Sequence, residues 1–299
     1  MSVIWLDGKF VPSRKATANI LSHALHYGTG VFEGIRAYQT ANGSAVFRLP
    51  EHVDRFFRSI SAFGVALPYT KKEIKDAIRE AVLKNKLREC YIRPIAFFGE
   101  GSMGLTVKNA VLHVAIAAWP WGAYLGGDSP LSIGISNYAR FDPRSIVPGA
   151  KISGFYATSV LASIEAHRRG FDECVLLDTK GYVSEGPGEN IFLIKHKILY
   201  TPDSASILPG ITRESIMTIA KDMGIRTVQK PITVKELMAA DEAFFSGTAV
   251  EVASIGKIER RRIGTGGTGP VTGALKEAYA SATHGAARRY RSWLTSVRR

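Results

Sequence analysis

The sequence predicts an α+β protein of two domains: a small N-terminal α/β domain over residues 1–121, a linker over 122–130 and a larger C-terminal domain over 131–299. A chain of 299 residues can build two hydrophobic cores. Helix-like and strand-like segments mix in the first 120 residues, whereas short strand-like segments dominate after residue 170 and favour a twisted, barrel-like sheet. The Gly- and Pro-rich stretch "PWGAYLGGDSP" marks the linker. Strands and helices do not alternate regularly, which excludes a doubly wound Rossmann fold.

In the N-terminal domain, the opening residues "MSVIWLDGKFV" alternate around Asp7-Gly8 and predict a hairpin. Apolar residues at helical spacing predict one helix over 50–64 and another over 69–87, the second opening with the capping box of Thr70 and Glu73. The segments "CYIRPIAFFG" and "AVLHVAIAAW" predict two buried strands of one sheet.

In the C-terminal domain, after Lys151, helical spacing in "ATSVLASIEAHRRG" predicts an amphipathic helix that ends at Gly170. In "ILPGITRESIMTIAKDMG", Thr212 is the expected N-cap of a helix that ends at Gly224. The loop "GTGGTGPVT" leads to a last helix that begins at Pro270. Strands are predicted at 173–178, 181–186, 190–202, 226–231, 242–247 and 251–258.

Composition indicates a cytoplasmic protein. Hydrophobic residues make up 45% of the chain, charged residues 22%, and no apolar run approaches the ~20 residues of a membrane span. The N-terminal hairpin is unlike a signal peptide. Cys90 and Cys174 stand alone in separate strand-like runs, so we expect neither a disulfide framework nor a metal site.

The net charge of +13 is concentrated at the C-terminal end, where residues 255–299 hold ten Lys or Arg and two Glu. The segment "ERRRIG" is typical of an exposed turn, and no RNA-binding or helix-turn-helix signature occurs. We therefore expect no nucleic-acid partner, although the field would favour phosphorylated or carboxylated small molecules.

Lys151 is a candidate for chemistry because it lies among small and apolar residues in "IVPGAKISGFY", without a nearby acid. Such a lysine either reaches solvent from a loop or sits in a site that changes its protonation. In "GYVSEGPGENIF", Glu185 and Glu189 cannot be helical, and we expect at least one to be buried. They are either acids of a surface turn or a carboxylate that faces a cationic nitrogen heterocycle.

Two small-residue turns are candidates for phosphate binding. Gly210, Ile211 and Thr212 precede a helix whose first backbone N–H groups can bind an anion. The turn 246–248, with Gly247 and Thr248, follows a strand and offers further amides and a hydroxyl. The two turns could hold one phosphate from both sides.

In their order along the chain, these segments resemble the motifs of the pyridoxal-phosphate-dependent branched-chain aminotransferases of fold type IV. The resemblance covers nearly the whole chain and rests on "YGTGVFEGIRAY", "EHVDR", "YIRP", "WPWGAYLG", "AKISGFY", "YVSEGPGENIF", "LPGITR", "SGTAVE" and "GPVT". It implies transamination between Leu, Ile or Val and 2-oxoglutarate, with pyridoxal phosphate as cofactor. It also implies that Lys151 is the catalytic residue, which forms the imine with the cofactor and moves the substrate proton.

The resemblance further implies the surroundings of the cofactor and of the substrate. Glu185 would hold the pyridinium nitrogen and Tyr156 the ring hydroxyl, and the remaining cofactor residues would be Arg55, Leu208, Gly210, Ile211, Thr212, Gly247 and Thr248. Arg93, with Tyr91, would recognise carboxylates, for which the alternative is a buried ion pair. The implied substrate residues are Tyr27, Phe32, Gly34, Arg36, Tyr91, Arg93, Leu105, Tyr124, Thr248 and Ala249. Tyr27 and Leu105 would come from a partner subunit of a homodimer or dimer-based hexamer.

Two relatives of the same fold are alternatives, namely a D-amino-acid transaminase and an aminodeoxychorismate lyase. The D-specific enzymes carry an Arg-x-His carboxylate trap where this chain has "YIRPIAFF", and the lyases lack the "FEGIR" stretch found here. The chain departs from many relatives at Phe155 and in "NYARFD", which concerns the range of substrates. A basic binding protein on a retired enzyme fold is a third alternative, against which Lys151, Tyr156 and Glu185 argue.

Overall fold

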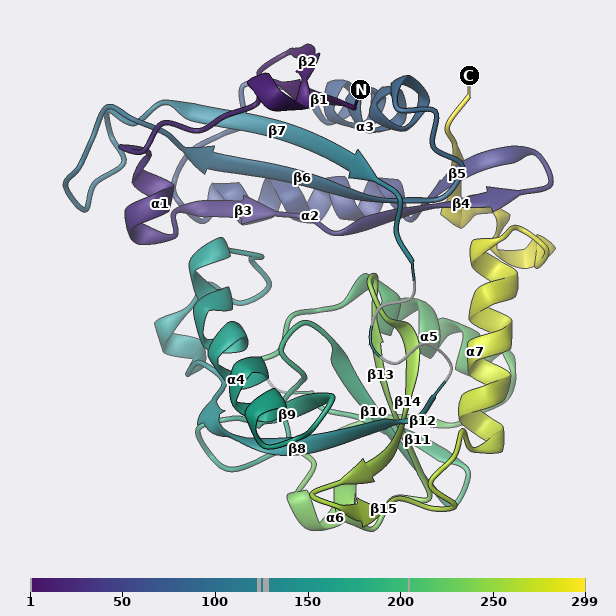
Figure 1. The fold of residues 1–299 in the computed structure, drawn as a ribbon. Helices are drawn as coiled ribbons and strands as arrows, with labels where there is room; N and C mark the ends of the chain where they lie inside the picture. The colour runs from purple at the N-terminus through teal and green to yellow at the C-terminus, as the bar shows by residue number, and fades with distance from the viewer. Residues whose placement is uncertain (1, 123–124, 126–128, 204, 299) are drawn as a thin grey trace. The chain divides into compact units, whose positions relative to one another are not determined.

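The computed structural model describes residues 2–122, 125, 129–203 and 205–298 (Figure 1). Its contacts divide the chain into a first unit of Met1–Gly122, Ala150–Phe155 and Ala282–Arg299, and a second unit of Ala123–Gly149 and Tyr156–Ser281. The sequence predicted an uninterrupted second domain over 131–299. The structure instead groups 150–155 and 282–299 with the first unit, because each of these segments joins strand pairing there.

The sheet of the first unit is antiparallel throughout its described residues. β1 and β2 form the predicted hairpin, with Asp7 and Gly8 at φ 47° and 92°. The two predicted buried strands are confirmed as the neighbours β6 and β7. The sheet order is β16 (Leu294–Ser296), β5 (Gly43–Phe47), β4 (Ile35–Thr40), β6 (Cys90–Phe98), β7 (Leu112–Trp119), β1 (Val3–Leu6) and β2 (Lys9–Pro12), while β3 (Gly30–Phe32) also pairs with β6.

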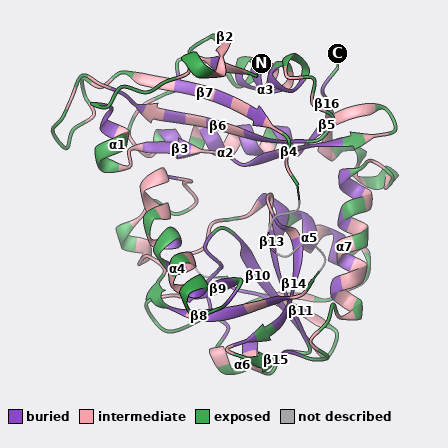
Figure 2. Ribbon diagram, viewed as in Figure 1, coloured by how far each residue is buried: buried purple, intermediate pink, exposed green. Residues whose placement is uncertain are grey.

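Helices α2 (Leu49–Ser61) and α3 (Lys71–Lys84) pack on this sheet and confirm the two predicted helices. The Thr70–Glu73 capping box is present at the start of α3. Phe56 and Ile60 from α2 join Ile74 and Ile78 from α3 in one buried core. Figure 2 shows that both helices carry buried positions. The unit also holds α1 (His23–Tyr27), η1 (Ser13–Lys15), η3 (Ser153–Phe155) and η4 (Arg288–Trp293).

The sheet of the second unit is mixed, and together the two units confirm the α+β class. The pairs β11–β12, β14–β8 and β8–β9 are parallel and the others antiparallel. Residues 181–186, predicted as a strand, form only the isolated bridges Leu177–Val183 and Glu185–Asn190, because the chain bends at 187–189. The order is β12 (Thr227–Gln229), β11 (Ile198–Thr201), β10 (Asn190–Lys195), β13 (Glu242–Gly247), β14 (Glu251–Ile258), β8 (Leu131–Ala139) and β9 (Glu173–Leu177), with β15 (Arg261–Arg262) on β14.

Helix α4 (Tyr156–Arg168) lies along β8 and β9 and precedes Gly170, which has the predicted left-handed backbone at φ 83° (Figure 1). Its exposed side carries Val160, Leu161 and Ile164, so the helix is apolar on both sides rather than amphipathic. Pro270 begins α7 as predicted. The other helices are α5 (Ile211–Asp222), α6 (Val234–Met238), α7 (Pro270–Thr283) and η2 (Pro143–Ser145). Among the described residues, no helix has both the length and the apolar character to cross a membrane.

Candidate active site

The predicted site residues are divided between the two units. The first unit holds Tyr27, Phe32, Gly34, Arg36, Arg55, Tyr91, Arg93, Leu105 and Lys151. The second unit holds Tyr156, Glu185, Leu208, Gly210, Ile211, Thr212, Gly247, Thr248 and Ala249. Tyr124 lies outside the described residues.

The backbone around Lys151 is fixed on both sides. Its N–H donates to Ser59 Oγ at 2.9 Å, and its carbonyl accepts from Phe32 N at 3.2 Å. Further along, Gly154 N donates to the Gly28 carbonyl at 3.0 Å. A Cβ at Gly28, which has φ 66°, would come within 2.6 Å of Gly154 Cα, so this approach of two backbones needs glycine. The loop therefore presents Lys151 from a fixed frame.

The ring of Phe32 brings two predicted cations together. Lys151 Nζ lies 4.7 Å and Arg93 Cζ 4.8 Å from the ring centroid, distances of cation–π contact. Arg93 Nη2 donates to Tyr91 Oη at 3.3 Å, while its buried Nε has no hydrogen-bond partner among the described residues. A Cβ at Gly34 would stand 2.0 Å from Tyr91 Oη, so glycine leaves the space that this hydroxyl occupies.

Arg93 is thus a half-buried cation that forms no ion pair with a carboxylate of the described chain. No acid among those residues pairs with Arg93, so the structure does not support the alternative of a buried ion pair there. An arginine on a strand with an unused N–H group is suited to bind a carboxylate from outside the chain. Arg36, on the neighbouring strand β4, stacks over the ring of Tyr38 at 4.9 Å and pairs in register with Tyr91.

Arg55 belongs to a buried charged cluster that the sequence did not reveal. Its Nε and Nη2 donate to Glu33 Oε1 and Oε2 at 2.7 and 2.8 Å, and His52 Nδ1 lies 2.7 Å from Oε2. Burial alone would raise the pKa of Glu33, but Arg55 and His52 outweigh it and lower that pKa to about 2. Burial lowers the pKa of His52. Glu33 lies in the motif "FEGIR" and His52 in the motif "EHVDR". Their place in these two motifs was the sequence signal that could have identified them.

Tyr27 and Leu105 share an exposed apolar surface of the first unit. Tyr27 Oη donates to the Met103 carbonyl at 2.9 Å, and His23 Nε2 lies 2.7 Å from the Gly104 carbonyl, which ties α1 to the loop that carries Leu105. Leu105 itself is 84% exposed. We call this surface the α1 patch; it consists of Ile20, Leu21, Leu25, Tyr27, Met103 and Leu105.

Glu185 is the buried acid of the second unit. Leu208 N donates to its two oxygens at 3.2 and 3.1 Å, and Asn190 Nδ2 donates to Oε2 at 3.0 Å. Arg140 Nη2 lies 2.5 Å from Oε1, in a pair whose side chains are 11% and 5% exposed. Glu189 is also buried, but its carboxylate accepts from Gly188 N within the turn. Arg140 and Asn190 were missed, although Arg140 stands in the noted segment "NYARFD".

The two predicted small-residue turns also lie in the second unit. Gly210, not Thr212, is the N-cap of α5, so the prediction for Thr212 is wrong; Gly210 is extended and a Cβ there would stand 2.0 Å from Asn190 Oδ1. Thr212 lies buried in the first turn of a helix whose N-cap makes no side-chain hydrogen bond. An uncapped helix N-terminus is suited to bind an anion.

The other turn begins at Thr248 and Ala249, directly after β13. Ser246, the last residue but one of β13, is completely buried, and its Oγ has no hydrogen-bond partner among the described residues. A buried hydroxyl without a partner is costly unless something else bonds to it.

The family model for class IV aminotransferases matches residues 30–258. This chain belongs to the class IV aminotransferases. The class IV aminotransferase is 46% identical to a branched-chain-amino-acid aminotransferase of Pseudomonas aeruginosa, over 99% of this chain and 97% of the relative. It is 39% identical to the Escherichia coli K12 enzyme of the same name, over 98% and 97% of the two chains.

Solved structures give the same result for the fold. The class IV aminotransferase resembles the T.th. branched-chain amino acid aminotransferase complexed with N-(5′-phosphopyridoxyl)-L-glutamate, with a TM-score of 0.96, 44% identity and coverage of 99% and 98% of the two chains. It also resembles the Thermoproteus uzoniensis branched-chain aminotransferase with norvaline, with a TM-score of 0.95, 41% identity and 99% coverage of both chains. Fold type IV is therefore confirmed.

Proposed function

We propose that this class IV aminotransferase transfers amino groups between branched-chain L-amino acids (Leu, Ile, Val) and 2-oxoglutarate, giving branched 2-oxo acids and L-glutamate, with pyridoxal 5′-phosphate as cofactor. The observation that carries the proposal is the arrangement around the ring of Phe32. Lys151 and Arg93 both lie against this ring, and Arg93 pairs with no carboxylate among the described residues. This arrangement supplies an amine for proton transfer next to an apolar wall and a carboxylate receptor. Relatives of 39–46% identity bear the name of this activity.

Features of the second unit fit the cofactor. The uncapped start of α5 at Ile211 and Thr212 and the Ser246 hydroxyl, unpartnered among the described residues, suit a phosphate. The buried Glu185 suits a pyridinium nitrogen because a carboxylate favours the charged ring. Arg55, Gly210, Gly247 and Thr248 are the further proposed phosphate residues, and Tyr156 and Leu208 the proposed ring contacts.

When bound, the cofactor supplies an electron-withdrawing ring that stabilises negative charge at the substrate's α carbon. Lys151 is proposed to bind the cofactor, to take the α-carbon proton at its Nζ and to pass that proton to the cofactor. Its fixed backbone holds that nitrogen in place during both transfers. Arg93 and Tyr91 orient the side-chain carboxylate of glutamate, and Phe32 contacts the aliphatic chain of leucine. Gly34, Arg36, Tyr124, Thr248 and Ala249 complete the proposed substrate residues.

The active unit is proposed to be a homodimer, in which each site takes Tyr27 and Leu105 from the partner. The α1 patch supports this, because it exposes a contiguous set of aliphatic and aromatic side chains that a second copy would cover. Glutamate introduced at Leu105 should dissociate the dimer in sedimentation and lower activity. The control Leu83→Glu alters an exposed leucine of α3 outside the patch and should do neither. An active wild-type monomer would refute the proposal.

The reaction is tested with a panel of L-Leu, L-Ile, L-Val and D-Ala as donors to 2-oxoglutarate. The wild type should convert 2-oxoglutarate to glutamate with the branched L-amino acids as donors. Lys151→Ala should have no turnover, and the control Lys180→Ala, at an exposed lysine, should match the wild type. Turnover of D-Ala alone would identify a D-amino-acid transaminase instead. A wild-type rate in Lys151→Ala would exclude this lysine.

Arg93 is tested by comparing the two half-reactions. Arg93→Met should slow the reaction of glutamate by about 30-fold more than that of leucine, since only glutamate loses a charge-assisted bond of about 2 kcal/mol. The control Arg88→Met removes an arginine just before β6, outside the proposed site. Equal losses in both half-reactions would show that Arg93 is structural.

A further inference from the structure

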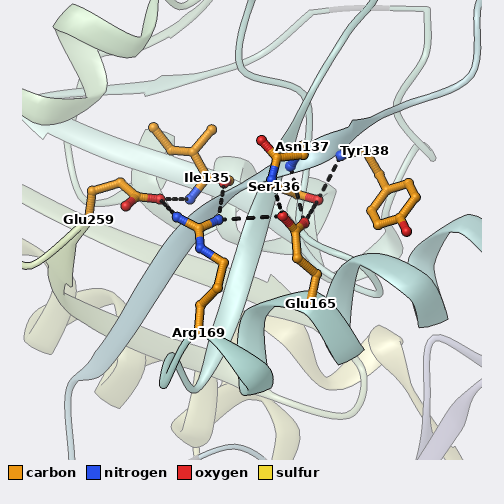
Figure 3. Close-up of polar contacts among 7 residues, drawn as sticks. All are labelled: Ile135, Ser136, Asn137, Tyr138, Glu165, Arg169 and Glu259. Carbon is orange, nitrogen blue, oxygen red and sulfur yellow. Dashed lines mark hydrogen bonds and ion pairs between the residues drawn. The ribbon is translucent and has the colours of Figure 1, made fainter.

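A polar clamp ties α4 to β8 in the second unit. Glu165 on α4 accepts from Ser136 Oγ at 2.8 Å, from Asn137 N at 3.1 Å and from the Asn137 side-chain amide (Figure 3). One turn later, Arg169 donates to the Ile135 carbonyl at 2.8 Å and to Glu259 at 2.6 Å. Burial opposes ionisation of Glu165, but its hydrogen bonds outweigh this and lower its pKa. Helix and strand are thus fixed against each other.

Arg140 follows β8 directly and continues this link toward Glu185. Its N–H donates to the Leu177 carbonyl of β9 at 2.7 Å, which fixes the backbone. Its Nη1 donates to Ser159 Oγ at 3.2 Å, and Ser159 is a buried residue of α4. Its Nη2 lies 2.5 Å from Glu185 Oε1. The guanidinium therefore connects a fixed helix to the buried acid.

We propose that Arg140 is a positioning residue, which fixes the orientation and the ionised form of the Glu185 carboxylate so that this carboxylate can bind the pyridine nitrogen of the cofactor. The proposal rests on the role proposed above for Glu185. Leu208 and Asn190 also donate to Glu185, through a backbone N–H and a side-chain amide, and both of these donors are neutral. Arg140 supplies positive charge at the carboxylate itself, and a charged donor orients a carboxylate more strongly than a neutral one. The charge of Arg213 also acts on Glu185. The N–H groups of Arg213, however, donate to Thr201, the Pro202 carbonyl and Gln229.

The sign of the pH effect follows from burial. Without Arg140, the buried Glu185 carboxylate would take up a proton at higher pH, because burial disfavours its charged form. A protonated Glu185 no longer stabilises a pyridinium. Loss of Arg140 should therefore weaken cofactor binding, and the loss should grow as the pH falls.

The experiment measures the dissociation constant of pyridoxal phosphate for the full-length apo-protein by tryptophan fluorescence between pH 5.5 and 8.5. Arg140→Met should weaken binding by about tenfold at pH 8 and more at pH 5.5, the size expected for one charge-assisted bond. Arg140→Lys should recover most of the affinity, since it restores the charge. The control Arg144→Met removes an arginine whose side chain is 90% exposed and pairs with Asp142, and it should match the wild type.

Two further variants separate this inference from the proposed function. If Glu185→Gln leaves both the affinity and its pH profile unchanged, the proposed role of Glu185 is wrong. If Glu185→Gln alters them while Arg140→Met and Arg140→Lys do not, only the inference for Arg140 is overturned. The double variant Arg140→Met/Glu185→Gln should bind no more weakly than Glu185→Gln, since Arg140 acts through Glu185. If the losses of cofactor affinity add, Arg140 does not act through Glu185. This comparison remains valid even if Arg140→Met alone is unstable.

Discussion

Each unit contains a buried glutamate paired with an arginine, and the two pairs differ in their donors. In the first unit, the Glu33 side chain is completely buried and receives two N–H groups of Arg55 and the ring of His52. In the second unit, Glu185 receives a charged group from Arg140 and the neutral donors of Leu208 and Asn190. The oxygens of Glu33 thus accept from a guanidinium and an imidazole ring. The oxygens of Glu185 accept from one guanidinium and from two neutral groups. The first arrangement stabilises an arginine; the second suits a carboxylate that must bind an external cation.

The largest effect should come from breaking the fully charged pair. Glu33→Gln leaves Arg55 buried without its counter-ion, and removing one partner of such a pair costs about 3–5 kcal/mol. Urea unfolding of the apo-protein measures the change. The control is Asp54→Asn, which removes the partner of Lys71 in an ion pair whose side chains are 53% and 45% exposed, and it should cost less than about 1 kcal/mol. Equal losses of unfolding free energy in the two variants would show that burial does not determine how much Glu33 contributes to stability.

The same pair predicts a dependence on acid. The pKa of Glu33 is lowered from 4.5 to about 2, so its stabilisation is complete above pH 4.5 and is lost as the pH falls toward 2. A difference of this size corresponds to about 3 kcal/mol. The wild type should therefore lose stability more steeply than Glu33→Gln over this window, measured as unfolding free energy at each pH. Parallel curves would contradict the assignment.

A smaller effect should follow from disturbing a neutral donor of Glu185. In Gly210→Ala, the new Cβ would meet Asn190 Oδ1 at 2.0 Å, so Asn190 must move away from its bond to Glu185. We expect a loss of stability of about 1–3 kcal/mol and weaker binding of pyridoxal phosphate. The control Gly188→Ala places a Cβ where no atom lies within 4 Å. Unchanged cofactor affinity in Gly210→Ala would separate Asn190 from the function of Glu185.

The smallest expected effect tests whether the difference between the two glutamates arises from their donors or from the units that contain them. Thr70 and Thr233 form the same exposed capping box, at α3 in the first unit and α6 in the second. Thr70→Ala and Thr233→Ala should each cost about 1 kcal/mol in urea unfolding. Costs that differ by several-fold would mean that the units respond differently to the same local change, and the difference between the two glutamates would then partly reflect the units that contain them.

Local signals predicted the local structure well. The Asp7-Gly8 hairpin, the Thr70 capping box and the start of α7 at Pro270 each depend on a few adjacent residues, and all three are confirmed. The N-cap of α5 was misassigned because the choice of Gly210 depends on Asn190, which is distant in sequence. Propensity alone does not separate Gly210 from Thr212, because Thr and Gly are about equally favourable N-caps.

The site shows the same limit. The motifs predicted roles for Lys151 and Glu185, but they did not point to the partners Arg140 and Asn190 or to the acid that holds Arg55. Pairing between Arg140 and Glu185 depends on how β8, β9 and α4 come together, which no spacing along the chain encodes. From the sequence alone, Arg93 could be part of a buried ion pair or a cation that binds a carboxylate from outside the chain. The choice depends on the side chains around it, which only the structure places.

The pairing of β16 with β5 has a consequence for synthesis. During translation, β5 emerges early, whereas Leu294 and Ser296, which cover its edge, emerge last among the paired strands. At ~5–20 residues per second, the nascent first unit carries an open strand edge for on the order of tens of seconds. Open edges pair readily with other chains. A ribosome that stalls before residue 294 would therefore release a chain prone to aggregation, with most of the site residues already made.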